Sequence, residues 1–294
     1  MTVILPPDFP DVHEITLQHL SQNGVLESGG APKLLVVTGL TGAGKSTWGK
    51  AWAQERGDVL LDVDETVWRS FGAPKDEDEY NKQRKEVLPT AKAVLEELFA
   101  YQADVVWPAV GAKRHHLVDY ANAKKAGYEI EIRHIAAPHD ICDARAKNDN
   151  RFINVVSDDV LEGNRRWYAE GMMMQLKSAN NFSCYWNPHE LTEGQERTPI
   201  LAWSVEHGEI TVHDAAATHA YLTSHRDLLN NDNLGKLPPA NEIPKDEERL
   251  SKLLGEQLVE PMLAATMPPA VDVLESYRQA PPIRPPQRDS GLMR

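Results

Sequence analysis

Short apolar runs alternate with helix-length stretches from residue 33 to about residue 178. The apolar runs predict strands at 34–38, 59–62, 103–107 and 128–135. The stretches between them predict helices at 45–55, 80–100 and 114–126, followed by helical segments between 138 and 178. Strands that alternate with helices form parallel sheets through right-handed crossovers, with helices on both faces. The pattern therefore predicts an α/β protein with a mostly parallel sheet.

The regions on either side of this pattern differ from it. Residues 11–22 predict an accessory helix within an N-terminal segment, 1–30, that precedes the main domain, 31–235. Late in that domain, runs at 199–205 and 209–213 flank a turn and predict a hairpin added to the main sheet, before a helix near 214–229. The rest, 236–294, is a Pro-rich tail in which an apolar stripe predicts a short helix within 246–260, and about the last fifteen residues are expected to be disordered.

Composition narrows the function classes. The chain has 294 residues, 41% of them hydrophobic, which is enough for a sizeable buried core. A net charge of −13 disfavours binding to nucleic acid or to an anionic membrane, because such binding is driven by Lys and Arg. No apolar stretch is long enough for a membrane span and the start lacks signal-peptide features, so we expect a cytoplasmic protein. The two cysteines, Cys142 and Cys184, are expected to be reduced.

A phosphate-binding loop follows the first predicted strand. The chain matches the pattern G-x-x-x-x-G-K-[ST] with Gly39, Leu40, Thr41, Gly42, Ala43, Gly44, Lys45 and Ser46. Glycines let consecutive N–H groups curl around an anion, and the helix that begins near Lys45 adds its positive N-terminal end. Lys45 is expected to bridge the β- and γ-phosphates of ATP, Ser46 to bind Mg²⁺, and Thr47 to add a second hydroxyl. The motif predicts the P-loop NTPase fold, with ATP and Mg²⁺ as cofactors.

Acidic residues follow the second predicted strand, in the sequence Asp62-Val63-Asp64-Glu65. Ligands of open α/β sheets bind at the carboxyl ends of the strands, so these acids are expected beside the phosphate loop. Phosphoryl transfer to a hydroxyl needs a carboxylate that takes the acceptor's proton, and we assign this role to Asp64. Asp62 is expected to support the acceptor or the metal ion. The alternative is that Asp64 caps the helix that follows it.

With these motifs in this order, residues 33–175 resemble the zeta-toxin-like P-loop kinases. The resemblance rests on the phosphate loop, on Asp62-Val63-Asp64 after the second strand, and on a helix that runs into a strand at residues 123–130, AKKAGYEI. It implies a kinase, with Asp64 at the position of the family's catalytic base. It also implies phosphate-clamping arginines in the helical region after the fourth strand, which nominates Arg145 and Arg151. For each arginine, surface solvation is the competing reading.

The third predicted strand departs from the family pattern. Founding toxins phosphorylate UDP-N-acetylglucosamine and carry a Glu-Gly-Thr-like motif there, whereas this chain has Val105-Val106-Trp107-Pro108-Ala109, without an acid. Relatives among bacterial effectors phosphorylate NAD. Trp107 is expected to stack on a flat ring, unless it is a core aromatic, and Lys113 and Arg114 are expected to attract a diphosphate. The adjacent His115 and His116 are interpreted as surface residues rather than a metal site.

The leading hypothesis is therefore an ATP- and Mg²⁺-dependent kinase acting on a hydroxyl of a nucleotide-type metabolite, NAD or a UDP-sugar, with a toxic effect on metabolism. Two alternatives stay open. One is a polynucleotide 5′-kinase, which the acidic composition disfavours, and the other is an ATP-binding interaction module without catalysis. An antitoxin or chaperone partner, the oligomeric state and export without a cleavable signal also stay open.

Overall fold

The computed structural model describes residues 30–111, 114–148, 156–188, 198–230, 234 and 236–267. The predicted accessory helix at 11–22 and the last residues of the tail lie outside this part of the chain.

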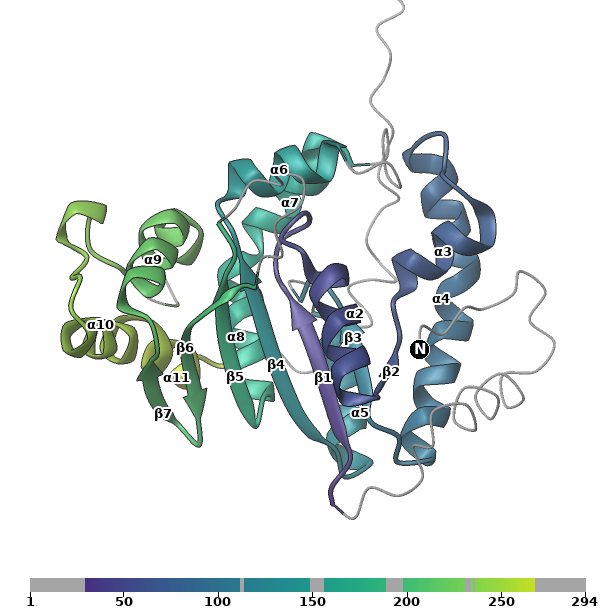
Figure 1. The fold of residues 1–294 in the computed structure, drawn as a ribbon, viewed down its shortest axis with the longest axis horizontal. Helices are drawn as coiled ribbons and strands as arrows, with labels where there is room; N and C mark the ends of the chain where they lie inside the picture. Colours follow the sequence, from purple (N-terminus) through teal and green to yellow (C-terminus); the bar gives the residue numbers. More distant parts are fainter. Residues whose placement is uncertain are drawn as a thin grey trace, which may run out of the picture.

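A seven-stranded sheet forms the centre of the molecule, in the order β2-β3-β1-β4-β5-β6-β7 (Figure 1). Its strands are β1 (Lys33–Thr38), β2 (Val59–Leu60), β3 (Val105–Pro108), β4 (Glu129–Ala136), β5 (Asn181–Trp186), β6 (Ile200–Glu206) and β7 (Glu209–Val212). The first five strands are mutually parallel, whereas β6 and β7 are antiparallel to their neighbours. The prediction of a mostly parallel α/β sheet is confirmed. Because β1 lies between β3 and β4, its four central residues, 34–37, have no exposed surface.

Helices cover both faces of the sheet. They are α2 (Lys45–Arg56), α3 (Val63–Phe71), α4 (Glu77–Ala100), α5 (His116–Lys125), α6 (His139–Asn148), α7 (Asp158–Arg166), α8 (Tyr168–Ser178) and α9 (Ala215–Leu229). Neighbouring residues of β4 show the two faces. Arg133 lies 4.5 Å over the ring of Trp52 in α2, whereas the His134 ring lies 2.7 Å from the Tyr168 hydroxyl of α8 on the opposite side.

The antiparallel end of the sheet contains the predicted hairpin and one strand that the sequence pattern did not predict. β6 and β7 meet at Glu206 and Glu209, with His207 and Gly208 at positive φ in a two-residue turn. β5 was not predicted, because its sequence, NFSCYW, is short and partly polar rather than a continuous apolar run. Its residues alternate between buried and half-buried positions, as expected of a strand with helices or loops on both faces.

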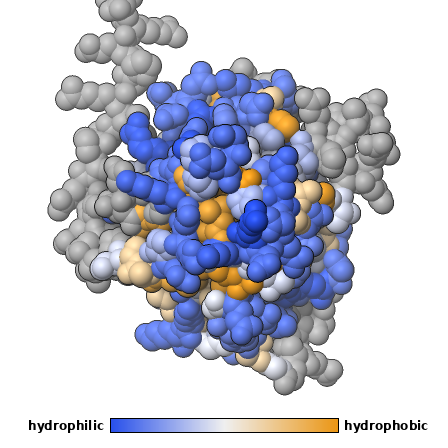
Figure 2. Space-filling view, turned by 90° about the vertical axis from the view of Figure 1, so that its left-hand side faces the viewer, coloured by the Kyte–Doolittle hydropathy of each residue, from blue (hydrophilic) through white to orange (hydrophobic). Residues whose placement is uncertain are grey.

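The C-terminal segment packs on this antiparallel end. It contains α10 (Glu247–Leu254), a π-helical turn (Gly255–Val259) and α11 (Glu260–Ala264). Leu250, Leu254, Leu258 and Met262 have no exposed surface and belong to the same hydrophobic core as the sheet. The Lys177 ammonium at the end of α8 donates to the Ala265 carbonyl. Figure 2 shows the resulting face, on which hydrophobic residues lie among mainly hydrophilic ones.

Both cysteines are buried and free, and burial raises the pKa of the Cys142 thiol to about 12. None of the helices in the described part of the chain is both long and apolar enough to cross a membrane.

Replacing Leu254 by Ala tests whether the C-terminal helices stabilise the core. We expect Leu254→Ala to lower the free energy of unfolding by about 2–5 kcal/mol, because it removes a fully buried side chain and leaves a cavity. The matched control is Leu263→Ala in α11, where the leucine is 38% exposed and the loss should stay below about 1 kcal/mol. Urea unfolding measures both. Equal losses for the two variants would show that the docked helices do not contribute to the cooperative unit.

Candidate active site

The predicted phosphate loop lies between the end of β1 and the start of α2. Three of its glycines have positive φ: Gly39 at 140°, Gly42 at 84° and Gly44 at 105°. Two of them also lie against backbone. A Cβ on Gly39 would be 2.2 Å from the Ile135 carbonyl oxygen of β4, and a Cβ on Gly42 would be 2.0 Å from the Cys142 carbonyl oxygen of α6. Glycine is therefore required at both positions by conformation and by space.

Buried polar side chains hold the start of this loop. The Thr38 hydroxyl donates to Gln175 Oε1 at 2.7 Å and lies 3.0 Å from His134 Nδ1. Gln175 in turn donates to the Gly111 carbonyl after β3. Burial lowers the pKa of His134 to about 4, so the imidazole is neutral at pH 7. The network connects the ends of three neighbouring strands, β1, β3 and β4, through groups that need one another to satisfy their hydrogen bonds.

Two amides hold the rest of the loop. Asn187, just after β5, donates to the Ala43 carbonyl at 3.0 Å. Asn164 of α7 donates to the Thr41 hydroxyl at 2.9 Å. The sequence analysis missed both asparagines, because they lie more than a hundred residues after the loop and belong to no motif.

Lys45 and Ser46 start α2 and line a cavity beside the loop. The Lys45 ammonium donates to the Leu40 carbonyl at 2.9 Å. Burial lowers the pKa of Lys45, and the nearby Asp64 carboxylate acts in the opposite direction. Thr47, which was expected to add a second hydroxyl, is exposed and does not line the cavity.

The two predicted acids lie across the cavity from Lys45, at the carboxyl end of β2. Asp62 is 4% exposed, and its side chain accepts the Glu65 backbone N–H at 3.1 Å, so it caps α3. The cap considered for Asp64 is therefore made by Asp62. Asp64 lies in the first turn of α3, with its side chain 45% exposed. Its Oδ1 accepts a hydrogen bond from the Tyr80 hydroxyl at 2.6 Å and lies 3.6 Å from Arg84 Nε.

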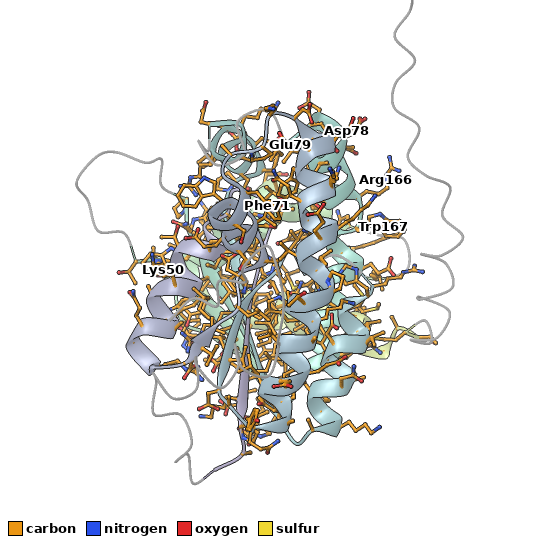
Figure 3. All side chains as sticks on the ribbon, turned by 90° about the vertical axis from the view of Figure 1, so that its right-hand side faces the viewer. Lys50, Phe71, Asp78, Glu79, Arg166 and Trp167 are labelled. Atoms are coloured by element: carbon orange, nitrogen blue, oxygen red, sulfur yellow. The ribbon has the colours of Figure 1, made fainter. Side chains whose placement is uncertain are left out.

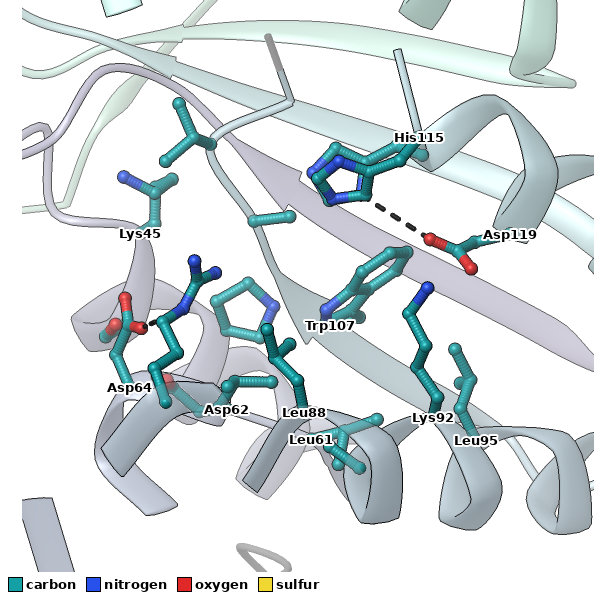
Figure 4. A pocket seen from close by; sticks show the side chains of 18 residues that line it. Lys45, Leu61, Asp62, Asp64, Leu88, Lys92, Leu95, Trp107, His115 and Asp119 are labelled. Carbon is teal, nitrogen blue, oxygen red and sulfur yellow. Dashed lines mark ion pairs between the residues drawn. The ribbon is translucent and has the colours of Figure 1, made fainter. Parts of the chain in front are cut away.

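Figure 4 shows how the cavity extends from these residues. Lys45, Asp62 and Asp64 lie at one end, and Trp107, Lys92, His115 and Asp119 lie at the other. α4 forms the wall between the two ends. The sequence analysis missed this wall, although the spacing of its lining residues along one helix face is a signal that the sequence contains.

Trp107 both packs in the core and lines the cavity. It is 8% exposed, and its ring contacts His116 edge-on at 5.0 Å and Tyr120 at 6.5 Å. The interpretation of both adjacent histidines as surface residues is wrong for His116, which is 8% exposed. α5 turns its ring inward against Trp107, and its Nδ1 lies 3.7 Å from Asp119 Oδ2. Within the described residues, no group of three His, Cys, Asp or Glu side chains is placed to hold a metal ion.

The structure does not bring all predicted basic residues to this cavity. Arg114 forms an ion pair with Glu170, lies 5.5 Å over the ring of Trp167 and does not line the cavity. Trp167 is 48% exposed and points outward (Figure 3). Arg145 lies on α6, one turn after Cys142, and is half-buried. Lys113 and Arg151 lie outside the described residues.

Comparison with known proteins agrees with this fold. A family model described as an AAA domain matches residues 34–170, from β1 into α8. No curated protein matches the chain.

Solved structures share the fold at low sequence identity. A chain of the AvrRxo1-ORF1:-ORF2 complex with ATP is 16% identical, with a TM-score of 0.53, over 91% of this chain and 88% of its own length. A chain of the PezAT toxin–antitoxin system of Streptococcus pneumoniae is 17% identical, with a TM-score of 0.43, over 62% and 80%. Shikimate kinase from Acinetobacter baumannii, in complex with shikimate, is 20% identical, with a TM-score of 0.37, over 58% and 89%. The predicted P-loop α/β fold is confirmed.

Replacing Gly42 by Ala tests the close packing of the loop. We expect Gly42→Ala to weaken ATP binding at least tenfold, because the added methyl group would displace the loop from the Cys142 carbonyl. The matched control is Gly57→Ala, which places Ala at a similar positive φ, 76°, with nothing within 4 Å of the new Cβ. Isothermal titration calorimetry measures ATP affinity for both variants. Similar ATP affinity in the two would show that close approach at residue 42 does not shape the loop.

Proposed function

We propose that this chain is a zeta-toxin-like kinase that transfers the γ-phosphoryl group of ATP to a hydroxyl of a nucleotide-type metabolite, NAD or a UDP-sugar. One observation carries the proposal. A single cavity is lined by the phosphate-loop residues Lys45 and Ser46 and, opposite them, by the carboxylates Asp62 and Asp64. Phosphoryl transfer needs these groups together, with room beside them for an acceptor.

The nucleotide end of the reaction uses the loop. Its backbone N–H groups and the N-terminus of α2 favour the phosphates of ATP. Lys45 lines the cavity, and its ammonium donates to the Leu40 carbonyl. When ATP binds, the ammonium would exchange this hydrogen bond for contacts with the β- and γ-phosphate oxygens. Arg145 on α6 and Arg151 are the proposed clamp on the transferring group, because planar guanidinium groups match phosphoryl oxygens.

Magnesium fits the residues at this end. Ser46 and Asp62 both line the cavity, and hydroxyl and carboxylate oxygens are ligands that Mg²⁺ takes, together with nucleotide phosphates. When bound, the ion neutralises charge that develops on the phosphoryl oxygens. Asp62 also caps α3, so the same carboxylate would hold the helix that carries Asp64.

Asp64 is the proposed base. It takes the proton from the acceptor hydroxyl as the hydroxyl oxygen bonds to phosphorus and the bond from phosphorus to the β–γ bridging oxygen of ATP breaks. Tyr80 and Arg84 contact Oδ1, and within the described residues Oδ2 has no protein partner. One oxygen therefore anchors the carboxylate, while the other is open to the cavity.

The acceptor would occupy the part of the cavity toward Trp107. The indole and the aliphatic side chains of α4 offer an apolar surface to a flat ring. The third strand lacks the acid of the founding toxins, and for this reason both NAD and a UDP-sugar are candidate acceptors. Lys113 and Arg114, proposed from sequence as diphosphate contacts, contribute less support because Arg114 is paired with Glu170.

The proposal extends to a partner protein of the antitoxin or chaperone type. Its support is that the structurally similar AvrRxo1 chain was solved in a complex of two proteins.

Two substitutions test the assignment of the catalytic groups. Asp64→Asn should lower the rate of acceptor phosphorylation at least a hundredfold while ATP still binds, because general-base catalysis is lost and the phosphate loop is intact. Lys45→Ala should weaken ATP binding and transfer together. The readout is mass spectrometry of a metabolite extract incubated with the protein, ATP and Mg²⁺, which reports the gain of one phosphate.

Asp78→Asn is the control, since Asp78 is an exposed acid of α4 that does not line the cavity (Figure 3). Retained phosphorylation in Asp64→Asn would refute the assignment of the base. Phosphorylation of DNA ends in place of a metabolite would support the polynucleotide kinase. ATP binding without any phosphorylated product would support the interaction module.

A further inference from the structure

One face of α4 forms the wall of the cavity between its two ends. The lining residues of this helix recur at helical spacing, namely Arg84, Leu88, Ala91, Lys92 and Leu95. Three are apolar, and the two cations lie toward opposite ends of the cavity. Eight residues separate Arg84 from Lys92, which is about 12 Å along a helix. The wall therefore offers an apolar strip with a positive charge at each end.

Arg84 forms an ion pair with Asp64 but no hydrogen bond through its Nε. Its side chain is 33% exposed, and its Nε is buried without a hydrogen bond. The ion pair with Asp64 is long, because the distance of 3.6 Å from Nε to Oδ1 exceeds that of a hydrogen bond. Tyr80 already donates to this oxygen at 2.6 Å, so Asp64 stays anchored if Arg84 turns away.

The other charged groups around Arg84 have partners of their own. Asp62 caps α3, and Lys45 donates to the Leu40 carbonyl of the phosphate loop. An arginine with unused donors beside the proposed base is a binding group for an anion.

We infer that Arg84 binds a phosphate group of the acceptor, which makes the acceptor a phosphorylated hydroxyl compound. The inference rests on the proposed function and deepens it. Phosphate suits the guanidinium better than a neutral sugar hydroxyl, because two parallel charge-assisted hydrogen bonds form at once. With its phosphate on Arg84, the acceptor places a nearby hydroxyl against the open oxygen of Asp64, and its apolar part lies along Leu88, Ala91 and Trp107.

The test compares wild type with Arg84→Gln and Arg84→Lys. Lys85→Gln is the matched control, because it removes one charge from the adjacent exposed residue that does not line the cavity. The probes are NAD and UDP-N-acetylglucosamine, each beside its phosphate-free counterpart, nicotinamide riboside or N-acetylglucosamine. Calorimetry without ATP gives the affinity of each compound, and steady-state transfer from ATP gives kcat and both KM values. Circular dichroism verifies that each variant is folded.

We expect wild type to bind at least one phosphate-bearing probe in preference to its counterpart. Arg84→Gln should weaken that binding and raise the acceptor KM at least tenfold, with kcat and the KM for ATP within about threefold of wild type. Arg84→Lys should recover part of the affinity, and Lys85→Gln should match wild type.

The failures are distinguishable. The inference is overturned if phosphoryl transfer occurs with an acceptor KM that does not depend on Arg84, or if Arg84→Gln lowers kcat alone. Either result is still consistent with the proposed kinase. Arg84-dependent binding without transfer from ATP refutes the proposed kinase and leaves the anion site standing. Equal weakening of the phosphate-free counterparts, or no binding of either phosphate-bearing probe to wild type, also overturns the inference.

Discussion

The close contact of the phosphate loop with the backbone around it sets the geometry of the whole site. The loop passes so near the Ile135 and Cys142 carbonyls that a single added carbon does not fit at Gly39 or Gly42. These carbonyls belong to the end of β4 and to α6, so the strand and helix next to the loop limit its position. Thr38 reinforces the contact by bonding to Gln175 of α8. A rigid loop keeps the N-terminus of α2 and Lys45 aimed at one point, as preorganised stabilisation of phosphate requires.

The polar groups around that point differ in their burial and in their partners. Asp62 and Asp64 are two residues apart, yet the first is 4% exposed and caps a helix, whereas the second has its side chain 45% exposed and lines the cavity. The cap fixes the start of α3, and that start sets where Asp64 points. Tyr80 then holds one carboxylate oxygen from α4. Three elements thus position one carboxylate opposite Lys45.

The antiparallel end of the sheet lies apart from the candidate site. β6, β7, α9 and the C-terminal helices lie on the side of β5 away from β1, and none of their residues lines the site. Their buried leucines and Met262 join the core that also contains β1. This added core supports the strand ends indirectly, through β5 and through Asn187, which follows it and binds the Ala43 carbonyl. The described part of the molecule is therefore one hydrophobic unit with the site at one edge.

The sequence by itself determined the local parts of this protein. The run at 34–38, the glycines of residues 39–44 and the helix that follows define strand, loop and helix, because each depends on neighbours in the chain. Asp62 and Asp64 could be placed at the edge of the sheet because parallel strands end there together. Only the tertiary structure decided that Asp62 is the acid that caps α3 and that Arg114 forms an ion pair with Glu170. It also decided that Asn164 and Asn187 donate hydrogen bonds to the loop. It also turned His116 inward and made α4 the wall of the cavity. Such contacts join residues far apart in the chain, and their partners are set by how whole helices pack, which no local pattern encodes.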